Sequence, residues 1–171
     1  MARRYWLAVG AIAVAIAAVV LYGGLKSPTS ADGRAMILPV DADPLMVETG
    51  HGERSFSIEI ADDPGERERG LMFRDEMAAG HGMIFVHDSE ETQSYWMKNT
   101  KIPLDIIYFD HARKLVSVAH APPCSLGDGC PPFPSDGPAL YVLELNGGAA
   151  EEMGLKAGDE LKFGPGIPVR K

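Results

Sequence analysis

Short runs of alternating or continuous apolar residues recur along most of this chain. Residues 54–60 alternate polar and apolar side chains, which is typical of a half-buried strand. Continuous apolar runs of strand length are typical of buried strands, and they cover 82–87, 104–109 and 140–145. Shorter patterns predict further strands over 95–97, 114–120 and 160–163. Together these runs predict a mainly β fold in which seven or more short strands dominate and helix is a minority.

Two short helices are predicted from their end signals. Asp63-Pro64-Gly65-Glu66 offers an N-cap, a proline in the first turn and a capping-box glutamate, so a helix is predicted over 64–69 with its end at Gly70. A second helix is predicted over 146–153, with Gly154 as its C-terminal stop.

Residues 1–25 have the pattern of a targeting segment. Arg3-Arg4 precedes an uncharged, mostly apolar run over 5–25, about 20 residues and long enough to cross a bilayer. Basic residues stay on the cytoplasmic side, so the rest of the chain is expected in the cell envelope, periplasmic or otherwise extracytoplasmic. The length favours an uncleaved inner-membrane anchor, with 5–25 in the membrane. A signal peptide cut near 30–31 or 33–35, with secretion, is the alternative.

The remaining chain divides into a linker and one domain. Residues 26–50 carry Ser, Pro, Gly and Asp with little periodicity, which predicts a linker. Residues 51–171 are numerous enough for one domain with its own hydrophobic core. The net charge of −8 opposes binding to a phosphate backbone, so nucleic acid is not an expected partner.

Both cysteines lie in a segment dense in Pro and Gly over 121–138, which is predicted to be a loop. Because the compartment is expected to be oxidising, Cys124 and Cys130 are predicted to form a structural disulfide. A zinc site or a redox pair is the alternative.

Six phrases then stand in one order along the chain. They are RGLMFR at 69–74, GMIFV at 82–86, WMKNT at 96–100, IPLDII at 102–107, YVLEL at 141–145 and GD at 158–159. In this order they resemble the domain-of-unknown-function 192 (DUF192) family, over about residues 50–165. The resemblance implies a compact β-rich sandwich or barrel with short helices. It implies no activity.

The most specific of these phrases also contain the candidate ligand-binding residues. Trp96 offers a large apolar surface, Lys98 and Asn99 offer donors, and Asp105 is a carboxylate inside an apolar run. Strand residues alternate faces, so Trp96 and Lys98 are expected on one side. This mixture predicts a site for a small polar ligand such as a sugar or a peptide terminus. The alternative is a Lys98–Asp105 ion pair that fixes the turn.

Two arginines flank the first phrase. A guanidinium binds a carboxylate or phosphate through two hydrogen bonds, and on this ground Arg74 is added to the candidate ligand-binding residues. The alternative is that Arg69 and Arg74 form ion pairs with Asp75, Glu76 or Glu144.

Other chemistry finds little support in the sequence. The five histidines have no metal-ligand spacing; they are His51, His81, His87, His111 and His120. No nucleophile elbow and no glycine-rich phosphate loop are present. The sequence therefore predicts no metal, no cofactor and no catalytic residue.

The expected function is that of an exported, non-catalytic binding or interaction module for a small polar ligand. Two alternatives stay open. One is a small hydrolase-like envelope enzyme with Asp105 as base and Lys98 or Arg74 as electrostatic stabiliser. The other is a structural envelope protein.

Export can be tested with a reporter fusion. Alkaline phosphatase fused after residue 50 is expected to be active in cells, because Arg3-Arg4 and the apolar run should place the junction outside the cytoplasm. An inactive phosphatase, together with an active cytoplasmic reporter at the same junction, would contradict this.

Overall fold

The computed structural model describes residues 33–165 and 167, and in this part of the chain seven strands outweigh the short helices. The strands are β1 (Leu45–Thr49), β2 (Gly52–Ala61), β3 (His81–Trp96), β4 (Leu104–Phe109), β5 (Leu115–Ala121), β6 (Pro132–Asn146) and β7 (Glu160–Lys162). The helices are α1 (Pro64–Arg69), α2 (Ala149–Met153) and the 3-10 helix η2 (Gly127–Gly129). The predicted mainly β class is confirmed.

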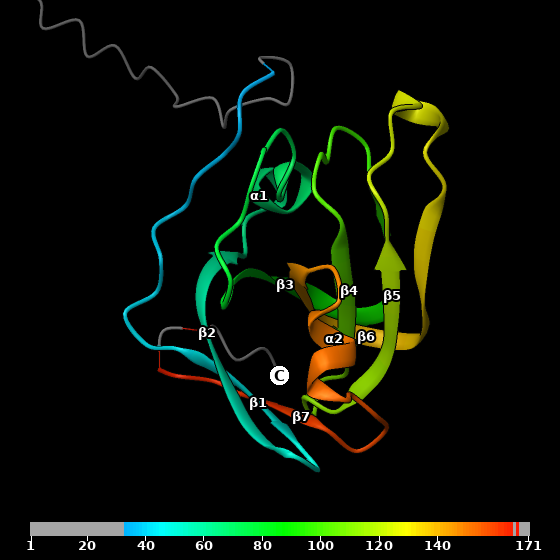
Figure 1. The fold of residues 1–171 in the computed structure, drawn as a ribbon. Coiled ribbons are helices and arrows are strands. Elements are labelled where there is room, and N and C mark those ends of the chain that lie inside the picture. Colours follow the sequence, from blue (N-terminus) through cyan, green and yellow to red (C-terminus); the bar gives the residue numbers. More distant parts are fainter. Residues whose placement is uncertain (1–32, 166, 168–171) are drawn as a thin grey trace, which may run out of the picture.

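The strands form one curled sheet in the order β5-β4-β6-β3-β2-β1-β7. All neighbours are antiparallel except β2 and β3, which run parallel because α1 and the loop after it cross back between them. The sheet curls around α2 into a half-barrel (Figure 1). Its two edges meet where Leu115 N donates to Asp159 O and Leu161 N donates to Arg113 O, both at 2.9 Å.

The hydrophobic core covers both faces of this sheet. All six residues of β4 are buried, and because strand residues alternate, its side chains divide between two clusters. Ile107 and Phe109 pack inside the curl with residues of α2, β1 and β7. Ile106 and Tyr108 pack on the opposite face under the loops around Leu71. A strand buried on both faces has no polar alternation, which explains the continuous apolar run of β4.

Helix α1 follows the predicted capping. The Asp63 carboxylate accepts a hydrogen bond from Gly65 N at 2.8 Å, and Asp63 N donates to the Glu66 carboxylate at 3.3 Å. The helix ends at Gly70, as predicted. The second predicted helix begins later, because Asn146 ends β6 and residues 147–148 form a tight turn before α2.

Two strand predictions were too short. The run over 82–87 and residues 95–96 of the second run belong to one strand, β3, and Met97 lies just beyond its end. This strand pairs with β6 from one end to the other except at two register shifts. The intervening residues are mostly exposed and polar, so hydrogen bonds to β6 hold them in the strand without an apolar pattern. For the same reason β6 begins at Pro132, inside the segment predicted as a loop over 121–138.

The predicted linker over 26–50 is corrected at its C-terminal end. Residues 45–49 form β1, which pairs with β2 and β7, and Leu45 and Val47 are fully buried in the core. Five residues are too few for a reliable periodic pattern, and partners distant in sequence provide the burial. The other predicted strands differ from β2, β4, β5 and β7 by at most two residues at an end.

The predicted membrane segment over 5–25 lies outside the described residues. Within 33–165 and 167, no helix is long and apolar enough to span a bilayer.

Candidate functional site

The candidate segment over 96–100 forms a turn at the end of β3. Asn99 has a left-handed backbone conformation with φ of 59°, which asparagine tolerates better than most residues. The Asn99 carbonyl accepts a hydrogen bond from Phe73 N at 2.8 Å, and Thr100 N donates to Met97 O at 3.1 Å. The turn is therefore fixed by backbone contacts, including one to the loop after α1.

The disulfide loop lies beside this turn. Cys124 and Cys130 are bonded, with their Cα atoms 5.9 Å apart, which confirms the predicted disulfide. Lys98 forms a backbone bridge with Cys124, and its ammonium pairs with the Asp128 carboxylate in η2. Two links thus hold the loop against the candidate segment.

Trp96 and Lys98 lie together, as their spacing predicts. The Lys98 Nζ atom is 4.8 Å from the centroid of the Trp96 ring, within cation–π distance. The Trp96 side chain is 41% exposed, so it gives an apolar surface at the protein exterior.

Asp105 is not part of this surface. Its side chain is fully buried, and its Oδ2 accepts hydrogen bonds from Gly148 N at 3.0 Å and Ala150 N at 2.7 Å. Its Oδ1 lies 2.7 Å from Nδ1 of His120. The alternative Lys98–Asp105 pair is not formed, because each charge has other partners. Asp105 instead holds the turn that leads into α2.

Arg74 is also buried and paired. Both of its terminal nitrogens donate to the Glu59 carboxylate, each at 2.6 Å. His81 Nε2 lies 2.9 Å from Glu59 Oε1, and Leu38 N donates to Glu59 at 2.7 Å. Burial raises the pKa of Glu59, but the hydrogen bonds from Arg74 and His81 outweigh it and hold the pKa below its usual 4.5. The ion-pair alternative holds for Arg74 with Glu59, a partner that the sequence analysis did not name.

A small cavity of about 30 Å³ lies under Trp96. Trp96 and Thr100 line it from the candidate segment, Arg69 from α1 and Glu144 from β6. Its other lining residues include Gly70, Leu71, Met72 and Phe85. Most of these residues belong to the phrases that carry the family resemblance, so segments far apart in sequence converge on one cavity. The volume suffices for a water molecule or a single hydroxyl group.

Glu144 is the unusual group in this cavity. Glu144 is 5% exposed, and among the described residues its pKa is influenced by burial and by the charge of Arg74, not by a hydrogen bond. Burial raises the pKa of Glu144 from 4.5 to about 8, although the charge of Arg74 acts in the opposite direction. At neutral pH the carboxyl group is therefore mostly protonated, and it can both donate and accept a hydrogen bond.

Two larger hollows adjoin the cavity. One of about 240 Å³ shares Tyr95 and Trp96 with it and also contains His87. The other, of about 500 Å³, lies between Asn99 and the disulfide loop. Burial and then the charge of Arg67 lower the pKa of His87 to about 4, so this imidazole is neutral at physiological pH. Trp96 thus lines both the cavity and the hollow at His87, and a ligand larger than one hydroxyl would extend into such a hollow.

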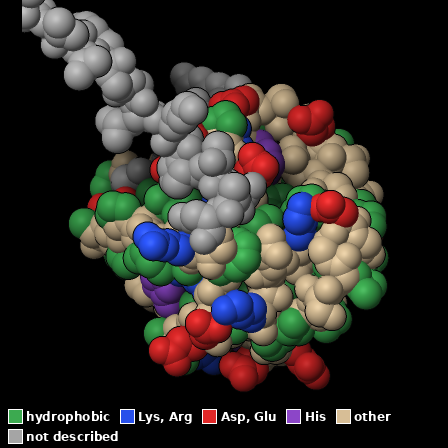
Figure 2. Space-filling model, turned by 90° about the horizontal axis from the view of Figure 1, so that it is seen from above, with side chains coloured by type: hydrophobic (Ala, Val, Ile, Leu, Met, Phe, Trp, Pro, Cys, Tyr) green, Lys and Arg blue, Asp and Glu red, His purple; other side chains and the backbone are tan. Residues whose placement is uncertain are grey.

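The end of the half-barrel that carries α1 and the disulfide loop has a mixed surface. Figure 2 shows hydrophobic side chains spread over this face, with Lys or Arg and Asp or Glu side chains scattered among them.

The sequence analysis missed Glu144 as a site residue and named it only as a possible ion-pair partner. A signal was present, because Glu144 is a carboxylate within an apolar strand run, as Asp105 is. The sequence does not distinguish the two carboxylates, since only the fold decides which one finds donors. Among residues 33–165 and 167, no group of three possible metal ligands is found.

The fold and cavity define a small β half-barrel with a buried carboxyl group under an exposed tryptophan. The chain belongs to the domain-of-unknown-function 192 (DUF192) family, described as "Uncharacterized ACR", whose model matches residues 46–163. A protein from Sinorhizobium meliloti 1021, described as a candidate transcription regulator, is 32% identical with a TM-score of 0.66, over 74% of this chain and 97% of that one. A protein of unknown function from Novosphingobium aromaticivorans is 35% identical with a TM-score of 0.66, over 79% of this chain and 99% of that one. No curated protein matches.

The role of Asp105 can be tested by unfolding. Asp105→Asn keeps the shape but removes the charge that accepts three hydrogen bonds, so the free energy of unfolding should fall by about 3 kcal/mol. The exposed Asp136→Asn is the control and should change little in urea denaturation. Because Lys98 does not contact Asp105, the effects of Lys98→Met and Asp105→Asn should add within about 0.5 kcal/mol. Strong coupling would contradict this arrangement.

Glu144 should make stability depend on pH. Between pH 4.5 and about 8 the folded state keeps a proton that the unfolded state has lost, so the contribution of Glu144 to stability falls as pH rises through this window. Glu144→Gln stays neutral. As pH rises from the acidic to the alkaline end of this window, the free energy of unfolding of Glu144→Gln should therefore rise by on the order of 4 kcal/mol relative to that of the wild type. Urea unfolding near pH 5 and near pH 9 measures this; a constant difference would contradict it.

Proposed function

We propose that this domain is a non-catalytic binding module for a small polar ligand, which contacts Trp96 and inserts a polar group toward Glu144. One observation carries the proposal: a nearly buried carboxyl group lines the same cavity as an exposed tryptophan. Burial disfavours the charged form of Glu144, which is why its pKa is raised to about 8. A ligand hydroxyl that hydrogen-bonds to this carboxyl group would offset part of that cost.

The protonation of Glu144 favours a sugar over a peptide amine. With a pKa of about 8, the group is mostly uncharged at neutral pH, so it offers little attraction to an ammonium. A hydroxyl group matches a neutral carboxyl group as both donor and acceptor. The cavity has room for one hydroxyl, and the apolar face of a sugar ring can lie on the exposed Trp96.

The proposed location is the cell envelope, either anchored in the inner membrane or secreted. Arg3-Arg4 followed by an apolar run supports export, and the Cys124–Cys130 disulfide suits an oxidising compartment.

Three other functions have less support. The Sinorhizobium relative is described as a candidate transcription regulator, but the net charge of −8 opposes contact with DNA. A hydrolase with Asp105 as its base is disfavoured, because this carboxylate is fully buried and accepts hydrogen bonds from Gly148 and Ala150. A purely structural envelope protein would have no use for the cavity under Trp96.

Calorimetric titration of the full chain with glucose, maltose and N-acetylglucosamine tests the proposal. At least one sugar should bind saturably. Glu144→Met should lower the affinity for that sugar about tenfold, because it removes a hydrogen bond. Because burial of the Glu144 carboxyl group is unfavourable, Glu144→Met should not lower the melting temperature. The exposed Glu91→Met is the matched control.

Lys98→Met separates binding from stability at the same site. The Lys98–Asp128 pair is at the surface, so its loss should change the free energy of unfolding by less than about 1 kcal/mol, while sugar binding weakens. The proposal fails if none of the three sugars binds, or if Glu144→Met leaves affinity unchanged.

A further inference from the structure

A second cleft lies on the other face of β6. Glu144 and Leu145 are neighbours in this strand, so their side chains lie on opposite faces of the sheet. Leu145 lines a cleft of about 410 Å³ between β2, the loop before β3, and α2. Its volume is in the range of natural sites for small molecules.

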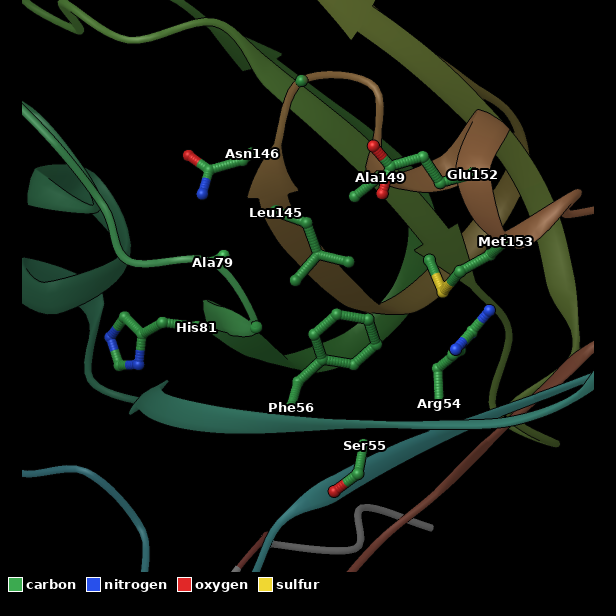
Figure 3. A pocket seen from close by; sticks show the side chains of 12 residues that line it. Arg54, Ser55, Phe56, Ala79, His81, Leu145, Asn146, Ala149, Glu152 and Met153 are labelled. Carbon is green, nitrogen blue, oxygen red and sulfur yellow. The ribbon is translucent and has the colours of Figure 1, made fainter.

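The floor of this cleft is apolar. Figure 3 shows Phe56 and Leu145 at its centre, with Met153 next to them. Leu145 and Met153 are buried members of the core inside the curl, and Phe56 packs against that core. The floor is therefore held by the main packing of the domain, and a flat apolar group can lie on it.

One side wall of the cleft is fixed by hydrogen bonds. His81 and Asn146 lie on this side in Figure 3. His81 Nδ1 is 2.9 Å from the Ser57 hydroxyl and its Nε2 is 2.9 Å from Glu59, so the ring presents its carbon atoms to the cleft. Asn146 Nδ2 donates to Met77 O at 2.9 Å, which leaves its carbonyl oxygen as an acceptor.

Two opposite charges lie on the other side. Arg54 and Glu152 are both exposed, and among the described residues no hydrogen bond or ion pair of either side chain is found. A guanidinium suits a ligand carboxylate, and a carboxylate suits a ligand ammonium. An apolar floor beside one charge of each sign matches a zwitterion that carries an apolar group.

We propose that this cleft binds a free amino acid with an aromatic side chain. Its carboxylate pairs with Arg54, its ammonium pairs with Glu152, and its ring lies over Phe56 and Leu145. The proposal is independent of the sugar site, because the two sites share no residue and lie on opposite faces of β6.

Calorimetric titration of the full chain with L-phenylalanine tests this. Saturable binding is expected, and both phenylalaninamide and N-acetylphenylalanine should bind more weakly because each lacks one charge. Glu152→Gln should lower the affinity for phenylalanine about fivefold and leave the affinity for N-acetylphenylalanine unchanged. Glu151→Gln is the matched control, since Glu151 is exposed on the same helix and does not line the cleft.

A large side chain at the edge of the cleft can block it without changing the core. Ala79 is exposed at the cleft, so Ala79→Trp should abolish phenylalanine binding while the melting temperature stays close to that of the wild type. Glu144→Met should leave phenylalanine binding intact. The proposal is overturned if phenylalanine does not bind saturably, if the amide and N-acetyl derivatives bind equally well, or if Glu151→Gln and Glu152→Gln behave alike.

Discussion

A fully buried carboxylate must find hydrogen-bond donors, and Asp105 finds them in parts of the chain that are far apart in sequence. Two donors are backbone amides at Gly148 and Ala150, at the start of α2, and His120 on β5 contacts the other oxygen. The charge thereby fixes the turn between β6 and α2 and places the helix inside the curled sheet. The core inside the curl depends on this placement, and so does the α2 wall of the cleft lined by Phe56 and Leu145.

Three of the four buried carboxyl groups in the described part of the chain differ in their hydrogen-bond donors. Asp105 has its donors from the backbone and His120, and Glu59 has them from Arg74, His81 and a backbone amide. For Glu144, burial and not a hydrogen bond dominates the pKa, which rises to about 8. The first two act as structural anchors. Glu144 is the carboxyl group that can still hydrogen-bond to a ligand. The proposed binding site is therefore centred on it.

The two proposed sites use the alternation of a single strand. Because Glu144 and Leu145 are consecutive, β6 presents a polar group to the cavity on one face and an apolar surface to the cleft on the other. Both faces of the sheet are covered by core residues, so both sites have rigid floors. Binding on one face need not disturb the other, because β6 is held by β3 and β4 along its length.

Local patterns in the sequence determined the mainly β class, the capped helix at 64–69, the buried strand at 104–109 and the pairing of Trp96 with Lys98. Each depends on residues a few positions apart, whose geometry is set by the period of a strand or a helix turn. Only the tertiary structure decided that Asp105 is an anchor and Glu144 lies in a cavity. The two carboxylates have the same local pattern, and what separates them is the set of donors that distant segments bring to each.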